Sequence, residues 1–262
     1  MSIHGDFGEI EVIGSFDYKT LTQSLTNIVA SHLPSLPGLP KMNPATNNNF
    51  ALTAHITKSD WLQQLVQVPL HLSEPLTLQG MVNDRMSEVS IECQIPKFYY
   101  NRSGYQNGHI SLTSPNDSLR YDISITKMDV DGDNMDLHAQ GTAHANQLIN
   151  TLNWDNHALQ RMSGQLNAIA NFDTSVDDKA TANVNIQPSR MTVNNTEWQI
   201  KPCYLSYSEK RLDINNFEMS HQQQHLRVNG KATADNHDSL NVDMQDVDIK
   251  YVLSLVDFDA VS

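Results

Sequence analysis

Residues 119–125 read Leu-Arg-Tyr-Asp-Ile-Ser-Ile, a strict alternation of apolar and polar side chains. Successive side chains of a β-strand point to opposite faces of the sheet, so this alternation is typical of a strand with one buried face. The stretch therefore predicts a strand that has one apolar and one polar face. The residues expected on its apolar face are Leu119, Tyr121, Ile123 and Ile125.

The same alternation recurs on both sides of this strand, from about residue 76 onward. Turn-forming residues separate the segments, among them Asn-Gly at 107–108, Pro-Asn-Asp at 115–117 and Asp-Gly at 131–132. We therefore predict a mainly β protein, an elongated antiparallel sheet that curls into a groove with an apolar interior. The further residues expected to line this groove are Leu137, Leu166, Val184, Ile186, Leu212, Ile214, Leu226, Val228, Leu240, Val242 and Met244.

Four short segments have helical spacing of their apolar residues instead of alternation. They lie at 17–33, 59–68, 146–154 and 248–256. Each would carry an apolar face but is too short to be a stable helix alone. We expect such helices to cap the apolar interior of the sheet.

The stretch LPSLPGLP at 33–40 starts a loop that we expect to reach residue 49, because its prolines suit neither a helix interior nor a central strand. The expected organisation is a strand-helix-loop-helix part over residues 2–75 and a β-meander over residues 76–262. These two parts could form one continuous domain. We expect the chain to be a segment of a longer protein.

Composition and charge argue against several classes of function. The formal net charge of −13 argues against nucleic-acid binding and against docking on an anionic membrane surface, which both draw on Lys and Arg. Hydrophobic residues make up 39% of the chain, which indicates a thin core and favours an elongated shape. No apolar run approaches the roughly 20 residues that a membrane helix needs.

Two segments come close to metal-binding motifs but lack required residues. Residues 129–136 suggest a calcium loop, yet the glycine is at the fourth position and Gln140 stands at the twelfth. His221 and His225 lack the glutamate of a zinc-protease helix, and on a strand they would lie about 13 Å apart. No nucleophile elbow, phosphate loop or dinucleotide fingerprint occurs. We therefore expect no metal, no cofactor and no enzymatic activity.

Two residue pairs leave alternatives open. Cys93 and Cys203 belong to no C-x-x-C motif, so they could form one long-range disulfide or remain free thiols in strands, which we favour. Trp198 and Tyr204 could form an exposed sugar-binding platform or pack into the interior, and we favour packing.

Several stretches carry a resemblance to a known family. They are WQIKP at 198–202, LDINNF at 212–217, HLRVNGKA at 225–232, and DVDIKYVL at 246–253, with GDFG at 5–8 and LPSLPGLP near the N-terminus. With these motifs the chain resembles the TamB/AsmA-like proteins, in particular TamB of the Bacteroidetes type. The resemblance covers most of the chain and is weakest in the middle.

The resemblance implies a periplasmic part of an inner-membrane-anchored protein, with a taco-shaped β-sheet whose apolar groove passes phospholipids toward the outer membrane. It also implies a possible outer-membrane β-barrel partner in protein assembly. It carries no catalytic residues over to this chain. The rival interpretations are a β-sandwich adhesin or carbohydrate-binding module, and a hydrolase on a β-helix or propeller. We also expect unpaired edge strands to promote self-association.

Overall fold

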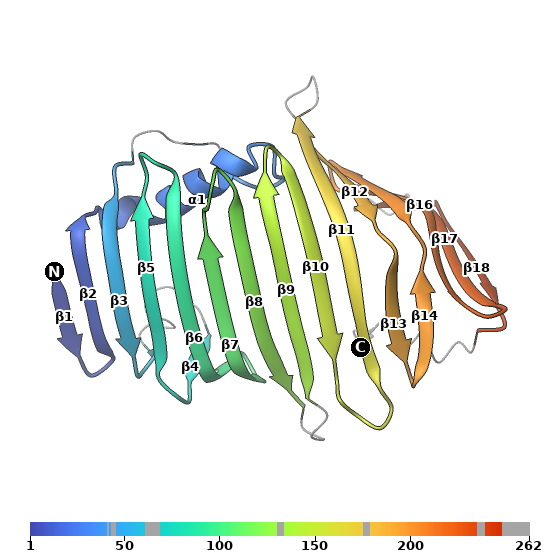
Figure 1. Ribbon diagram of the computed structural model, residues 1–262, viewed down its shortest axis with the longest axis horizontal. Coiled ribbons are helices and arrows are strands. Elements are labelled where there is room, and N and C mark those ends of the chain that lie inside the picture. Colours follow the sequence, from blue (N-terminus) through green and yellow to red (C-terminus); the bar gives the residue numbers. More distant parts are fainter. Residues whose placement is uncertain are drawn as a thin grey trace.

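The computed structural model describes residues 1–40, 42, 46–60, 69–129, 134–174, 179–234 and 239–247. Strands dominate this part of the chain and stand side by side, in chain order, in one long antiparallel sheet (Figure 1). The prediction of a mainly β protein with an elongated antiparallel sheet is therefore confirmed.

Tight turns connect most of the strands. In chain order they are β1 (Ser2–Gly5), β2 (Gly8–Ser15), β3 (Asn49–Ile56), β4 (Leu70–Leu72), β5 (Leu76–Asn83), β6 (Glu88–Tyr100), β7 (Ser103–Thr113), β8 (Leu119–Met128), β9 (Met135–His144), β10 (Gln147–Asp155), β11 (Met162–Thr174), β12 (Ala180–Ile186), β13 (Ser189–Val193), β14 (Thr196–Ile200), β15 (Cys203–Ser208), β16 (Arg211–His221), β17 (Gln224–Thr233) and β18 (Ser239–Gln245).

The sheet begins before the expected meander. β1 pairs with β2, β2 with β3, and β3 with β5, so strands on both sides of the expected boundary at residues 75 and 76 belong to the same sheet. At the other end β18 pairs with β17, and no further strand pairs with it among the residues that the structure describes. The described strands thus form one layer.

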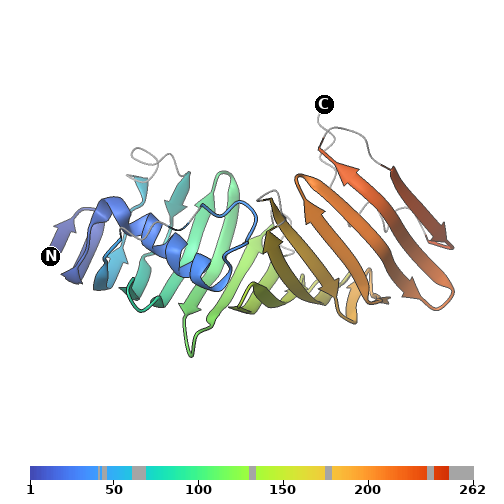
Figure 2. The same cartoon turned by 90° about the horizontal axis from the view of Figure 1, so that it is seen from above.

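At three places in the sheet, two short strands pair with the same neighbouring strand, and a proline lies between them. β4 and β5 both pair with β6 and are separated at Pro75. β12 and β13 both pair with β11 around Pro188, while β14 and β15 both pair with β16 around Pro202. Proline has no backbone N–H to donate to a neighbouring strand, so the ladder breaks at these positions. The breaks let the sheet change direction, which is visible from above (Figure 2).

The N-terminal helix lies where the sequence predicts it. A 3-10 turn, η1 (Tyr18–Thr20), leads into α1 (Leu21–His32), and Asp17 caps the turn by accepting a hydrogen bond from the Lys19 N–H. α1 crosses the upper ends of several strands and lies on one face of the sheet (Figures 1 and 2). The expected helix at 248–256 lies outside the described residues, as does the one at 59–68 from residue 61 onward.

The helix predicted at 146–154 is wrong, because this segment is strand β10. Leu148, Leu152 and Trp154 alternate with outward-facing residues, and β10 forms continuous ladders with β9 on one side and β11 on the other. Two complete hydrogen-bonded ladders outweigh the weak helical spacing of a segment that contains β-branched Ile149 and Thr151.

Candidate functional site

All the residues predicted to line a groove lie on one face of the sheet, which we call the apolar face. Cross-strand pairing shows this directly: Ile110 lies opposite Ile123, Ile123 opposite Ala139, and Ala139 opposite Leu152. Leu152 in turn lies opposite Leu166. Because directly opposed residues share a face, this row carries the apolar face from β7 to β11.

The apolar face continues to the last described strand. Val184 lies opposite Leu205, which lies opposite Ile214. Beyond them, Val228 pairs with Val242, and Leu226 pairs with Met244. The remaining predicted residues occupy the same face through equivalent pairs: Leu119, Tyr121, Ile125, Leu137, Ile186, Leu212 and Leu240.

The apolar face is not equally covered along its length. Trp198 and Val193 are 0% and 1% exposed and belong to a closed cluster over β12 to β17. Ile123 is 39% exposed and Val242 50%, although both stand on the same face. The face is therefore closed at some positions and open to solvent at others.

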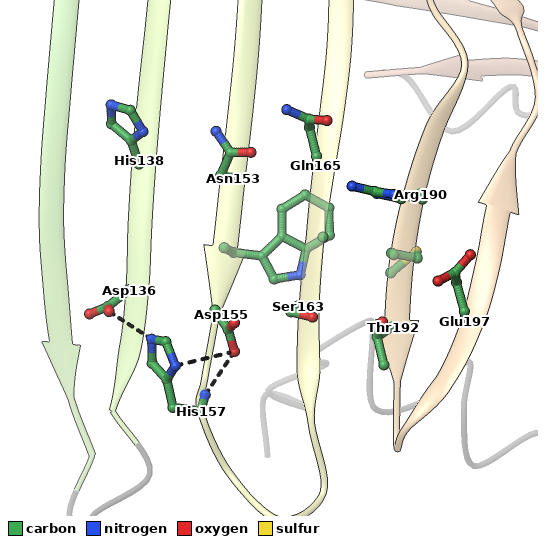
Figure 3. Close-up of a pocket in the computed structure, with 13 residues that line it drawn as sticks. Asp136, His138, Asn153, Asp155, His157, Ser163, Gln165, Arg190, Thr192 and Glu197 are labelled. Atoms are coloured by element: carbon green, nitrogen blue, oxygen red, sulfur yellow. Dashed lines mark hydrogen bonds and ion pairs between the residues drawn. The ribbon is translucent and has the colours of Figure 1, made fainter.

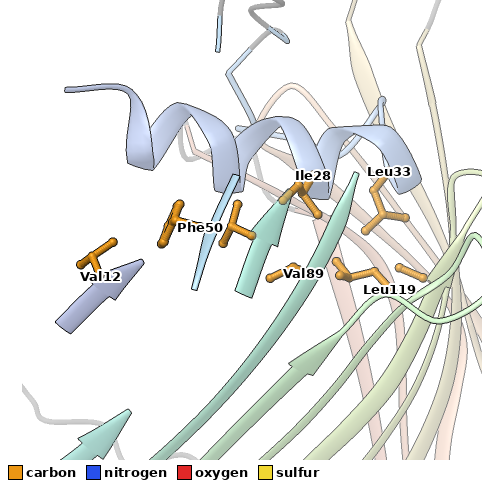
Figure 4. Packing of buried hydrophobic residues seen from close by; sticks show 8 residues of the cluster. Val12, Ile28, Leu33, Phe50, Val89 and Leu119 are labelled. Carbon is orange, nitrogen blue, oxygen red and sulfur yellow. The ribbon is translucent and has the colours of Figure 1, made fainter. Parts of the chain in front are cut away.

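Helix α1 covers one margin of the apolar face. Ile28 and the adjoining Leu33 pack on Val89 of β6 and Leu119 of β8, within a cluster that also includes Phe50 (Figure 4). Burial of these side chains holds the helix on the sheet, because each buried apolar residue contributes about 1.5–3 kcal/mol.

Polar contacts fasten α1 at both ends. Near its start, the Ser24 hydroxyl donates to Asp84 Oδ2 at 2.9 Å, and Asn48 Nδ2 donates to Ser24 Oγ at 2.6 Å. At its end, the Asn146 N–H donates to the His32 carbonyl at 2.9 Å. The helix is thus tied to the β3 and β5 region at one end and to the β9–β10 turn at the other.

On β10 a polar residue lies on the apolar face and is hydrogen-bonded there. Asn150 on β10 lies on this face opposite Gly141, and its side-chain oxygen accepts a hydrogen bond from the Tyr121 hydroxyl. A Cβ atom on Gly141 would stand 2.7 Å from the Tyr121 ring, so the glycine makes room for that ring. Burial raises the pKa of the Tyr121 hydroxyl, which keeps it protonated as a donor. The sequence did not predict Asn150 on this face, because a helix was expected at 146–154.

The opposite face is polar and carries ion pairs across strands. His109 on β7 contacts Glu92 on β6, and His138 Nε2 lies 3.0 Å from Asp122 Oδ2. The hydrogen bond from His109 lowers the pKa of the Glu92 carboxyl. These contacts are typical of a solvated strand face.

A polar hollow of about 470 Å³ lies on this face over β9 to β14 (Figure 3). His157 Nε2 lies 2.9 Å from Asp136 and its Nδ1 lies 3.8 Å from Asp155, which also binds Arg161 at 2.5 Å. The Arg161 hydrogen bond lowers the pKa of the Asp155 carboxyl, an environment that suits an ion pair rather than a general acid. Within the described ranges no three metal-ligating side chains come together.

The two open residue pairs are now placed. Cys93 and Cys203 are free, buried thiols, and burial raises the pKa of each. Trp198 is buried, so its predicted packing is confirmed. The predicted packing of Tyr204 is wrong, because Tyr204 pairs with Asn185 on the polar face and is 37% exposed.

Two segments came close to metal-binding motifs in the sequence, and only one of them lies entirely within the described residues. His221 stands beside the Trp198 ring, while His225 pairs with Asp243 at 3.0 Å. Residues 130–133 of the calcium-like segment lie outside the described part of the chain.

The comparisons with known proteins add no relative. No family model, no curated protein and no solved structure matches the chain. In the described portion of the chain, no helix has the length and apolar character of a membrane span.

Proposed function

We propose that this chain binds acyl-chain lipids along its apolar face and guides them without chemical change. The observation that carries the proposal is that opposed apolar residues follow one face of the sheet, from Ile110 to Leu166 on β7 to β11, from Val184 to Ile214 on β12 to β16, and at Val228 and Val242 beyond them. Part of this face is solvent-exposed, as Ile123 and Val242 illustrate. An exposed apolar surface that runs across many strands is a common sign of an apolar partner.

The energetics suit a lipid tail. Each methylene group removed from water gains about 0.8 kcal/mol, so a tail moving along a protein needs apolar cover at every step. On β10 the polar residue Asn150 lies on the same face beside Leu152, and its side chain accepts a hydrogen bond from Tyr121. At this position the apolar face thus avoids an unpaired polar group that would repel a tail.

The resemblance to TamB/AsmA-like proteins suggests where this function would take place. By this resemblance the chain is a periplasmic segment of an inner-membrane-anchored protein of the bacterial cell envelope. Its cargo is phospholipid on the way to the outer membrane. Its partner is an outer-membrane β-barrel that takes part in protein assembly.

A β-sandwich adhesin or carbohydrate-binding module remains the alternative. Such a module would use exposed aromatic side chains on its outside and would keep its apolar face closed. Tyr99, Tyr100 and Tyr204 are exposed aromatic residues that could serve a sugar. The two functions therefore differ in which face meets the ligand.

Photo-crosslinking in cells tests the proposal. A photoreactive residue is placed at position 123, 242 or 243, and lipid adducts are identified by mass spectrometry. Positions 123 and 242 are on the apolar face, and Asp243 is on the polar face of the same strand as 242. We expect adducts at 123 and 242 but not at 243. Equal labelling at 242 and 243, or none at 123 and 242 in folded protein, would overturn the proposal.

A further inference from the structure

A partly enclosed apolar space lies beneath the first turns of helix α1. It has a volume of about 190 Å³ and lies between α1 and strands β3, β5 and β6. Its lining residues are Leu21, Ser24, Leu25, Phe50, Leu52, Leu78, Gly80, Val82 and Ile91. We call this space the α1 cavity.

The chemistry of the α1 cavity is that of an apolar site. Ser24 is the polar residue in its lining, and the Ser24 hydroxyl is already bonded to Asp84 and Asn48. Cavities of about 150 Å³ lined by Leu, Ile and Phe stay dry and bind small apolar molecules such as benzene. The α1 cavity therefore favours an apolar ligand and disfavours water.

The roof of the cavity is held in place, so the space is formed before a ligand arrives. Ser24 and Asn48 fasten the helix to Asp84 beside the cavity. Ile28, one turn further along α1, is 2% exposed against the sheet. A preformed site avoids the free-energy cost of opening the helix for each ligand.

The cavity is continuous with the apolar face. Ile91, in its wall, lies opposite Leu112 on β7, and Leu112 lies opposite Tyr121 on β8. On the helix side, Leu25 lines the cavity and is 39% exposed, so the lining reaches the surface.

We propose that the α1 cavity receives the methyl end of an acyl chain whose remainder lies on the apolar face. The inference rests on the proposed function and makes it specific. The cavity has room for a short alkyl segment but not for a lipid headgroup or a whole lipid, and its apolar lining offers a charged headgroup no partner. An acyl chain would enter end first, and α1 would mark where the chain stops.

Gly80 provides a variant that fills the cavity from the sheet side. A Cβ atom there would stand 3.5 Å from its nearest neighbours, Ile91 Cγ1 and the Ser90 carbonyl, which is ordinary contact. Gly80→Leu therefore projects a side chain into the space, while Gly80→Ala is the matched control that leaves most of it open. Thermal unfolding of both variants is the control that tests whether they fold.

The probes are two fatty acids of equal length, one with a diazirine at the terminal carbon and one with a diazirine next to the carboxyl group. In the unaltered chain we expect the terminal probe to label residues 21–28 and the carboxyl-end probe to label other positions. Gly80→Leu should weaken binding about tenfold, the effect of about two methylene groups losing apolar cover. Gly80→Ala should bind like the unaltered chain.

The outcomes separate the two proposals. If Gly80→Leu leaves the labelling at Ile123 unchanged in strength and position, the proposal for the α1 cavity is overturned and the proposed function stands. Labelling of residues 21–28 by both probes alike would also overturn the cavity. If neither probe labels any part of the apolar face of the folded chain, both proposals fail.

Discussion

Ile123 on β8 lies directly opposite Ile110 on β7, on the apolar face, and the two residues are 39% and 36% exposed. In a closed core such a pair would be covered, as Val193 is at 1% exposure. The pair therefore marks an open part of the apolar face. Here an apolar ligand could replace water without any unfolding.

The first prediction concerns this open part. Ile123→Asp should reduce the capture of lipid by the purified chain, because a carboxylate there would lose hydration when a tail covers it. The matched control is Asp122→Asn, on the polar face of the same strand, which should capture lipid normally. Native mass spectrometry of co-purified lipid gives the readout. Equal lipid content in the two variants would contradict the prediction.

The second prediction compares an open and a closed position on the same face. Val242→Asp should cost little stability, because Val242 is 50% exposed and the introduced carboxylate would reach water. Val193→Asp should unfold the chain, because the carboxylate would be buried at a cost of several kcal/mol. Urea titration followed by circular dichroism measures both. Similar losses in the two variants would show that the face around Val242 is a sealed core.

The third prediction concerns Glu218, which Lys201 binds at 2.6 Å and Arg227 at 3.0 Å. These hydrogen bonds, that of Lys201 first, lower the pKa of its carboxyl. The stability they supply is present above the unfolded pKa of about 4.3 and is lost as pH falls through the lower folded value. Glu218→Gln should therefore destabilise the chain by up to about 1 kcal/mol at neutral pH.

The pH profile provides the check on Glu218. The stability difference between the unaltered chain and Glu218→Gln should stay constant from neutral pH to about pH 5 and shrink in more acidic solution. Chemical unfolding at a series of pH values measures it. A difference that persists unchanged in strong acid would mean that the ion pairs are not its source.

The fourth prediction concerns His32 at the end of α1. Its side chain is 4% exposed, and its Nε2 has no hydrogen-bond partner among the described residues. Burial lowers the pKa of the imidazole, although nearby Asp117 opposes this effect. The unfolded chain therefore binds the proton more readily, and stability should be complete above about pH 6.5 and decline as pH falls below it.

His32→Phe removes this titration and should flatten the stability profile just below pH 6.5. The control is His144→Gln, because the His144 side chain is 59% exposed and also lies near Asp117. Thermal unfolding at pH 7.5, 6.5 and 5.5 distinguishes the variants. An identical decline in the His32→Phe variant would assign the acid sensitivity to other groups.

The fifth prediction concerns the edge of the sheet at β18, which pairs with β17 alone among the described strands. An edge strand can accept a strand from another molecule, so the chain should associate as its concentration rises. Val242→Lys places a charge on the apolar face of this edge strand and should reduce association. Sedimentation velocity measures both, and a monomeric profile of the unaltered chain at high concentration would refute the expectation.

Much of the fold was predictable because strand alternation is a local property. The pattern at 119–125 predicted both the strand and its apolar face, and pairing with β7 and β9 then placed the equivalent residues of neighbouring strands together. Helix α1 was predictable for the same reason. Segment 146–154 was not, because its short apolar pattern fits a helix and a strand, and only the flanking strands β9 and β11 decided between them.

Within a regular strand such as 119–125, the sequence by itself determined which side chains share a face, because that depends on their position along the strand. The tertiary structure decided which of them are covered. Ile123 and Trp198 both lie on the apolar face, yet Ile123 is open to solvent and Trp198 is fully buried. Cover comes from elements distant in sequence, such as α1 above Val89 and Leu119 (Figure 4). For the same physical reason the α1 cavity exists only where that helix meets the sheet.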